Sequence, residues 1–190
     1  MLRALASQKQ EVSFEAAKAL VSWRIEESFP RIISIMLRGQ NPHNRAAAAY
    51  ALGMLTDKNA VEDLVGVLNG DDGSEVRSHA AEALGHISDT RATDSLIKSL
   101  EGESVEVRFW AAFALGEIGD PKAIPELERL AARDSPILPH WGSVSLEAQK
   151  AINRIRRSSR PSPIDARRSW SRFGPPPFVR PASPRSDREG

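Results

Sequence analysis

The sequence predicts an all-α fold, an α-solenoid of about four stacked helix pairs followed by a disordered C-terminal tail. Three observations predict it. A motif recurs from Asn44, from Val76 and from Val107, at offsets of 32 and 31 residues. Within each copy the apolar residues keep helical spacing, and no stretch alternates as a strand would. Since a lone helix pair cannot bury its apolar stripe, neighbouring pairs must stack to form a continuous core.

The first helix of each copy is rich in alanine. Three alanines and a leucine form one face of this helix, for example in the run from Ala48 to Leu52, and a glycine follows the leucine in each copy: Gly53, Gly85 and Gly116. Glycine inside a helix costs about 1 kcal/mol relative to alanine. We therefore expect neighbouring helices to make close contacts at these glycines.

The second helix of each copy begins after an aspartate. Asp57, Asp89 and Asp120 stand where the chain turns into it. Each is placed as an N-cap, accepting from backbone N–H groups two or three residues further on. Pro121 follows one of them at the first helical position, where its missing N–H costs nothing.

Weaker copies extend the array at both ends. One starts at Val12, and a half copy starts at Val144 after an insertion at 136–141. The predicted repeats lie near 12–40, 41–72, 73–103 and 104–135, with a closing helix at 143–157. Residues 1–8 read as the end of a second helix without its partner. We therefore expect either a truncated array or self-association through an uncapped N-terminal end.

Charge divides the chain into a body, residues 1–157, and a tail, residues 158–190. Residues 156–190 carry nine Arg against three acidic residues, a net charge of +6, which leaves −5 for the rest of a chain whose net charge is +1. The tail is rich in Pro, Arg and Ser, a composition typical of disorder. Binding of an anionic partner such as RNA through the tail stays open as a lesser alternative.

The composition excludes several kinds of site. The chain has no cysteine, so it has no disulfide, no thiolate metal site and no cysteine nucleophile. No run approaches the roughly 18 apolar residues of a membrane span, and the N-terminal residues do not form a secretory signal. No nucleophile triad, Gly-rich phosphate loop or carboxylate pair stands out. We expect a cytoplasmic protein without cofactor, metal or membrane association.

The repeated pattern V-R-x-x-A-A-x-A-L-G-x-I-x-D resembles the short HEAT-like repeat of the phycobilisome (bilin) lyases and of deoxyhypusine hydroxylase. The resemblance covers roughly residues 12–155 and implies a HEAT-repeat solenoid. The matched positions are packing positions, so they are specific for the fold and not for a function. A bilin lyase or lyase-associated subunit is the alternative function that the resemblance implies.

The hydroxylase part of the resemblance can be compared residue by residue. Those enzymes bind a di-iron centre through His-Glu pairs directly after the arginine that opens the first helix. The equivalent pairs in this chain contain no His-Glu, and they are Ala46-Ala47, Ser78-His79 and Phe109-Trp110. Hydroxylase activity is therefore not expected.

Two polar positions recur with the repeat. An arginine opens each first helix and an aspartate opens each second helix, which gives Arg45, Arg77, Arg108 and Asp57, Asp89, Asp120. The arginines could form an anion-binding row. Recurrence at the repeat period favours a structural role, in which Arg and Asp pair within or between repeats and fix the stacking.

Variable positions of the first helices supply one candidate binding surface. Superposed repeats align polar and aromatic residues at positions that the core does not need, namely Tyr50, His79, Glu82, Trp110 and Phe113, with Phe109 beside them. Exposed aromatic clusters often mark binding patches. Burial of Trp110 and Phe113 under the 136–141 insertion is the favoured alternative. His79, Glu82 and His86 share a helix face, but one helix rarely supplies a whole metal ligand set.

The second helices supply another candidate surface, because they usually line the concave side of such solenoids. Their non-core residues are mainly acidic and comprise Glu62, Asp63, Asp94, Lys98, Glu126, Glu128 and Arg129. A partner with a basic surface fits this face better than nucleic acid does. We therefore predict a non-catalytic protein–protein interaction scaffold or adaptor that binds through the faces of the solenoid.

Overall fold

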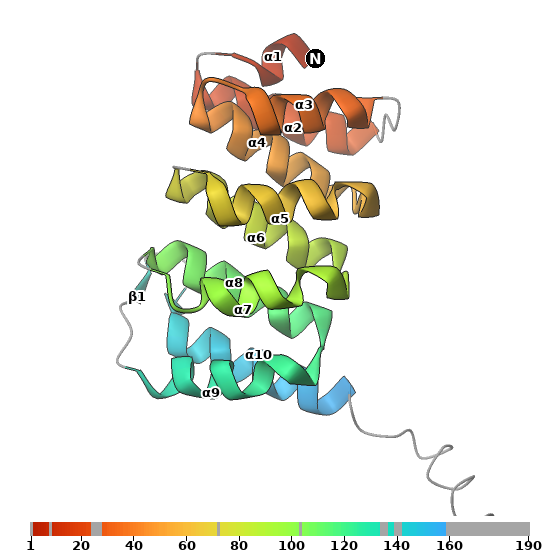
Figure 1. The fold of residues 1–190 in the computed structure, drawn as a ribbon. Coiled ribbons are helices and arrows are strands. Elements are labelled where there is room, and N and C mark those ends of the chain that lie inside the picture. Colours follow the sequence, from red (N-terminus) through yellow and green to blue (C-terminus); the bar gives the residue numbers. More distant parts are fainter. Residues whose placement is uncertain are drawn as a thin grey trace, which may run out of the picture. The chain divides into compact units, whose positions relative to one another are not determined.

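The computed structural model describes residues 2–7, 9–23, 28–71, 73–102, 104–133, 137–138 and 142–158. Its contacts divide the chain into Met1–Ser159 and Arg160–Gly190. The expected disorder of the tail and the expected cover from the 136–141 insertion lie largely outside the described residues. Figure 1 shows the helices of the first unit.

Helix pairs stacked in sequence order build the first unit, as predicted, and the all-α solenoid fold is confirmed. The first helices are α2 (Gln10–Trp23), α4 (Pro42–Met54), α6 (Ser74–Ile87), α8 (Val105–Ile118) and α10 (Val144–Ser158). The second helices are α3 (Phe29–Arg38), α5 (Val61–Gly70), α7 (Thr93–Ser99) and α9 (Ile124–Ala132). The short helix α1 (Leu2–Leu5) precedes them and buries Leu5.

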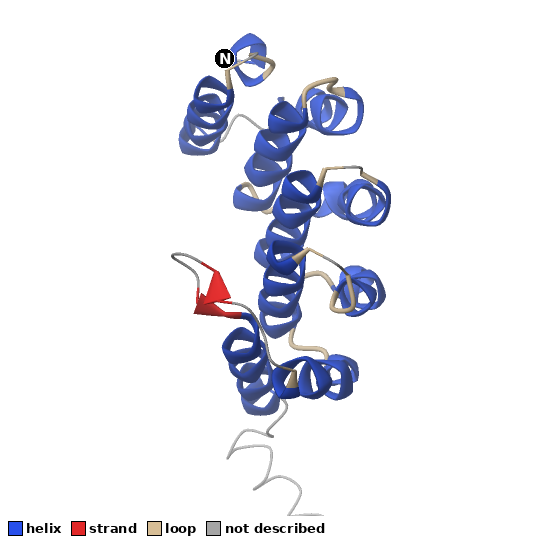
Figure 2. Cartoon of the chain, turned by 90° about the vertical axis from the view of Figure 1, so that its left-hand side faces the viewer, coloured by secondary structure: helices blue, strands red, loops and turns tan. Residues whose placement is uncertain are grey.

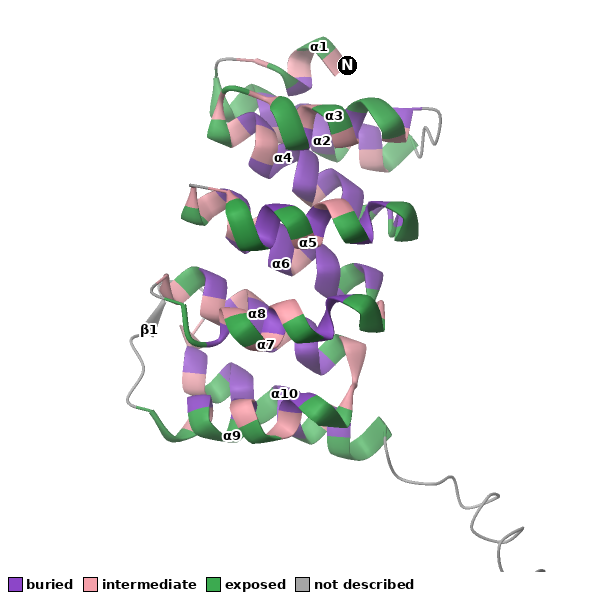
Figure 3. Ribbon diagram, viewed as in Figure 1, coloured by how far each residue is buried: buried purple, intermediate pink, exposed green. Residues whose placement is uncertain are grey.

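The two kinds of helix form two rows (Figures 1 and 2). Buried leucines and alanines fill the space between the rows and between successive pairs, and every helix pair contributes to this core (Figure 3). The row of first helices bows, so that α2 and α10 project on the side away from the second helices (Figure 2). We call the row of first helices the inner row and the row of second helices the outer row.

Small residues let the inner row pack tightly, as the glycine positions predict. A Cβ added at Gly53 would overlap Ala83, and one added at Gly85 or Gly116 would lie 2.9 Å from the Cα of Ala114 or Ala151. Backbones in the inner row therefore touch, whereas larger side chains separate the outer helices. The closer spacing of the inner helices explains why the stack bends toward them. The first helices therefore line the concave side (Figure 2), and the expectation that the second helices line it is wrong.

The turn into each second helix is capped as predicted. The carboxylates of Asp57, Asp89 and Asp120 accept from backbone N–H groups two residues on, at 3.0 Å in each case. Each cap opens a short 3₁₀ turn, and the α-helix continues from its end.

The recurring arginines bond to backbone carbonyl groups of the preceding pair, and not to the turn aspartates that were expected as their partners. Each donates from Nη1 to the carbonyl oxygen six residues before it, which lies just past the second helix of the preceding pair. These bonds join Arg45 to Gly39, Arg77 to Asp71 and Arg108 to Gly102, at 2.8, 2.6 and 2.6 Å. A cation at a helix C-terminus is favourable, because the carbonyl groups there lack partners and carry partial negative charge.

One small ladder interrupts the helical pattern. Strand β1 (Ile137–Leu138) pairs antiparallel with β2 (Gly142–Ser143) in the connection between α9 and α10. Two residues per strand are too few to show alternation, so periodicity could not have predicted this ladder.

Candidate functional site

A hollow of about 350 Å³ crosses the inner row and brings together four of the candidates predicted on the first helices, namely Tyr50, His79, Glu82 and Trp110. We call it the aromatic groove. Four successive first helices line it: Phe14 and Lys18 of α2, Tyr50 of α4, Ser78, His79 and Glu82 of α6, and Glu106 and Trp110 of α8. Residues spaced by one repeat in the sequence thus become neighbours on one surface.

Aromatic rings form the end of the groove near α2. The ring of Phe14 lies 5.2 Å from that of His79 and 6.2 Å from that of Tyr50, and Tyr50 meets His79 edge-on at 6.3 Å. Phe14 was absent from the predicted candidates. It opens the most degenerate repeat, and only the position of α2 beside α4 brings it to the groove.

Trp110 forms the other end of the groove. It is only partly buried, and it meets Phe109 and Phe113 edge-on, with centroid separations of 5.5 Å in both cases. Phe109 is buried, which corrects its place among the expected surface residues. Phe113 lies three residues after Trp110 on α8, and the guanidinium of Arg154 packs over its ring at 5.7 Å.

Glu82 carries the charge at the floor of the groove. His79 Nδ1 lies 2.9 Å from Glu82 Oε2, and His86 Nε2 lies 3.9 Å from Oε1. Burial pushes the pKa of Glu82 upward, but the hydrogen bonds and charges of His79 and His86 outweigh it and hold the pKa below its ordinary value. The carboxylate is therefore ionised at neutral pH although its side chain is only 12% exposed.

The other predicted candidates lie on the outer row, apart from the groove. Several of their charges are neutralised across repeats. Glu62 pairs with Arg91, Asp94 with Lys122, and Glu128 with Arg156, while Glu126 pairs with Arg129 in its own helix. Asp63 and Lys98 belong to the same row. Because many of these acidic residues are matched, the outer row is less acidic than its sequence indicates.

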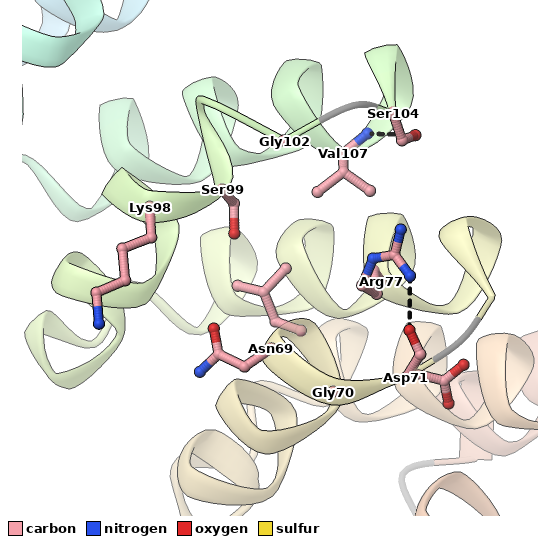
Figure 4. Close-up of a pocket in the computed structure, with 10 residues that line it drawn as sticks. Asn69, Gly70, Asp71, Arg77, Lys98, Ser99, Gly102, Ser104 and Val107 are labelled. Carbon is pink, nitrogen blue, oxygen red and sulfur yellow. Dashed lines mark hydrogen bonds between the residues drawn. The ribbon is translucent and has the colours of Figure 1, made fainter.

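A second, polar hollow of about 530 Å³ opens at the edge of the stack, where α5 and α7 end and α8 begins. Asn69, Arg77, Lys98 and Ser104 are among its lining residues (Figure 4). The carboxylate of Asp71, also in this lining, is held by Arg45 through two bonds of 2.6 and 2.9 Å. Arg77 is bonded to the Asp71 carbonyl, so these groups serve the junction between repeats.

Metal-ligand geometry is not found in the part of the chain that the structure describes. No group of three or more His, Cys, Asp or Glu side chains there could hold a metal ion. Nor is any described helix long and apolar enough to cross a membrane.

Comparison with known families agrees with the stack of helix pairs. The family model for HEAT repeats matches residues 1–85 and 70–139. The chain belongs to the HEAT-repeat family. The HEAT-repeat fold that the sequence pattern predicted is thereby confirmed. No curated protein matches this HEAT-repeat chain at a significant level.

Two solved structures are similar to this HEAT-repeat chain. One is the complex of CpcE and CpcF of phycocyanin lyase from Nostoc sp. PCC7120, with 24% identity and a TM-score of 0.65. That match covers 82% of this chain and 64% of the other, so this chain spans less than two thirds of its neighbour's length. The other is an engineered protein, with 25% identity, a TM-score of 0.56, and coverage of 82% of this chain and 78% of the other.

Proposed function

We propose that this HEAT-repeat chain is a non-catalytic scaffold that binds a segment of a partner protein in the aromatic groove. The observation that supports it is the row of partly exposed aromatic rings, Phe14, Tyr50 and Trp110, that line one hollow. Ala47 occupies the position in the second repeat that corresponds to Trp110, so the fold itself does not require an aromatic residue there. Aromatic side chains in a hollow are the usual anchors of protein interfaces.

The shape of the groove also suits an extended segment of a partner protein. It crosses four first helices, so an extended segment lying along it would contact several repeats. A solenoid presents such surfaces without moving its core, because each repeat packs only on its neighbours. Phe109 is buried behind Trp110 and restricts the indole, which lowers the entropy lost on binding.

Affinity capture with the tagged full chain, followed by mass spectrometry, would identify the partner, and titration of the purified partner would test the site. We expect Trp110→Ala to weaken binding by about tenfold or more, as loss of a central aromatic anchor does. Trp23→Ala is the matched control, because Trp23 is 63% exposed at the end of α2 and does not line the groove. Equal affinities for wild type and Trp110→Ala would contradict the proposal.

A role as a bilin lyase or lyase-associated subunit is the second candidate. The solenoid of a phycocyanin lyase complex supports it as a likeness of fold. The same capture experiment separates the two candidates. A tightly held tetrapyrrole, seen by its visible absorption, or recovery of phycobiliprotein subunits would favour the lyase role over a general scaffold.

We also propose weak self-association through the side of α2 that faces the N-terminal end of the stack. An apolar hollow of about 450 Å³ lies there, lined by Ala4 of α1 and by five residues of α2: Glu11, Val12, Glu15, Ala16 and Ala19. Val12 is 40% exposed, whereas its equivalents Val76 and Val144 are fully buried under the preceding pair. A surface that every later repeat covers is thus open in α2.

A further inference from the structure

We infer that the aromatic groove recognises an arginine side chain of the partner, seated between the ring of Trp110 and the carboxylates of Glu82 and Glu106. The inference rests on the proposed function, since it names the chemistry that the groove selects.

The groove carries an excess of negative charge. Two glutamates line it: Glu82, which is largely buried, and Glu106, which is exposed. The one lysine of the lining, Lys18, is already held by Glu15 at 2.8 Å. The Glu15–Lys18 pair is neutral as a unit, so the negative charge of the lining comes from Glu106 and from Glu82, whose Oε2 also contacts His79 at 2.9 Å. Glu106 is exposed, and its carboxylate accepts a hydrogen bond from the hydroxyl of Ser104 at 2.9 Å.

The chain already holds an arginine in this manner on the same row. Arg154 of α10 lies 5.7 Å above the ring of Phe113 and contacts the carboxylates of Glu117 and Glu147 at 3.3 and 3.2 Å. An aromatic ring and two carboxylates thus surround one guanidinium. The aromatic groove offers groups of the same kinds, Trp110 with Glu82 and Glu106, and the lining residues that the structure describes include no arginine. A partner's arginine would complete there the combination of groups that holds Arg154 over Phe113, the neighbouring ring of α8.

Arginine suits the groove better than lysine does. Its planar guanidinium stacks on an aromatic face while its N–H groups reach carboxylates at the edge, whereas an ammonium is a compact and strongly hydrated charge. Nucleic acid does not fit, since its phosphates would meet Glu82 and Glu106. The inference therefore specifies an arginine-bearing protein segment.

The test uses the full chain and three short blocked Gly/Ser peptides that differ at one central residue: arginine, lysine or neutral citrulline. Binding is followed by NMR through the indole N–H signal of Trp110, assigned from the spectrum of Trp110→Phe. We expect the arginine peptide to shift this signal and not that of Trp23. We expect the citrulline peptide to bind about tenfold more weakly, the ratio typical of losing one charge-assisted pair.

Carboxylate variants complete the test. Glu106→Gln should weaken binding of the arginine peptide several-fold, and because Glu106 is exposed this variant should keep its fold, as the unchanged remainder of the spectrum would verify. Glu126→Gln, on the outer row, is the matched control and should bind as wild type does. Equal binding of the citrulline or the lysine peptide would overturn the inference, as would a Trp110 signal that no peptide shifts.

Failure of this inference can be told from failure of the proposed function. Once the partner is known, its arginines can be replaced by glutamine and its affinity measured again. A partner that depends on Trp110 but not on its own arginines leaves the scaffold proposal standing and overturns the arginine assignment. A partner that is indifferent to Trp110 contradicts both.

Discussion

At the scale of single residues, short-range chemistry decides much of this molecule. The caps at Asp57, Asp89 and Asp120 need nothing beyond the next two residues, so their geometry repeats closely along the chain. Asp89 gains a further partner, because the guanidinium of Arg91 folds back onto its carboxylate with bonds of 3.0 Å. The hydrogen bonds from the Arg91 side chain and backbone N–H lower the pKa of Asp89 from 3.8 to about 2.

Asp89→Ala tests this cap and its pH dependence. We expect a loss of about 1 kcal/mol in the free energy of unfolding at neutral pH, because the cap of the α7 turn disappears. A carboxyl whose pKa is lowered on folding stabilises the fold above its unfolded value, and this contribution is lost as pH falls through the folded value. The difference between variant and wild type should therefore persist above pH 3.8 and vanish near pH 2.

Urea unfolding followed by circular dichroism across this pH range would measure the difference. Asp94→Ala is the control, since Asp94 is exposed and pairs with Lys122 at the surface. Such pairs contribute about 0–1 kcal/mol. A difference for Asp89→Ala that grows on acidification would contradict the assignment of the low pKa.

At the scale of elements, the seams of the inner row hold the stack together. Glycine and alanine face each other across successive first helices, so the backbones approach without an intervening side chain. The arginine bonds then join the starts of α4, α6 and α8 to the end of the preceding second helix in each case. Each pair is thereby fixed in both translation and angle relative to the next.

Gly53→Ala tests the seam between α4 and α6. The added methyl would overlap Ala83, and overpacking of this kind costs about 1–3 kcal/mol, more than the helix propensity that alanine gains. We expect a lower midpoint in urea unfolding. Gly66→Ala in α5 is the matched control, because nothing lies within 4 Å of its added Cβ, and it should stabilise the protein slightly. A stabilised Gly53→Ala would show that the seam is not close-packed in solution.

At the scale of the whole molecule, an apolar stacking face is open at α2. Its apolar residues Val12, Ala16 and Ala19 are flanked by Glu11 and Glu15. Two copies that meet through this face would bring their carboxylates together. Any self-association should therefore be weak and should strengthen when salt screens the repulsion.

Sedimentation equilibrium over a range of protein and salt concentrations would measure this association. We expect reversible self-association that increases with ionic strength and is abolished by Val12→Glu, because a further charge would enter the apolar face. Leu146→Glu, at another exposed apolar position, should associate as wild type does. A chain that stays monomeric under all conditions would contradict the proposal.

The repeat period, the helix types, the caps and the close contacts at glycine were all predictable from the sequence. These features depend on residues near one another in the chain or on a pattern that repeats, and both are visible in one dimension. The fold class and the HEAT-repeat family followed from them.

Only the tertiary structure decided which row is concave, because the curvature depends on the difference in spacing between two rows of helices. It brought Phe14 beside His79, buried Phe109 behind Trp110, and gave Arg45 its partner Asp71. Each of these contacts joins residues through packing angles and side-chain directions that no local pattern encodes. The aromatic groove belongs to this second class, since four helices must stack before its lining exists.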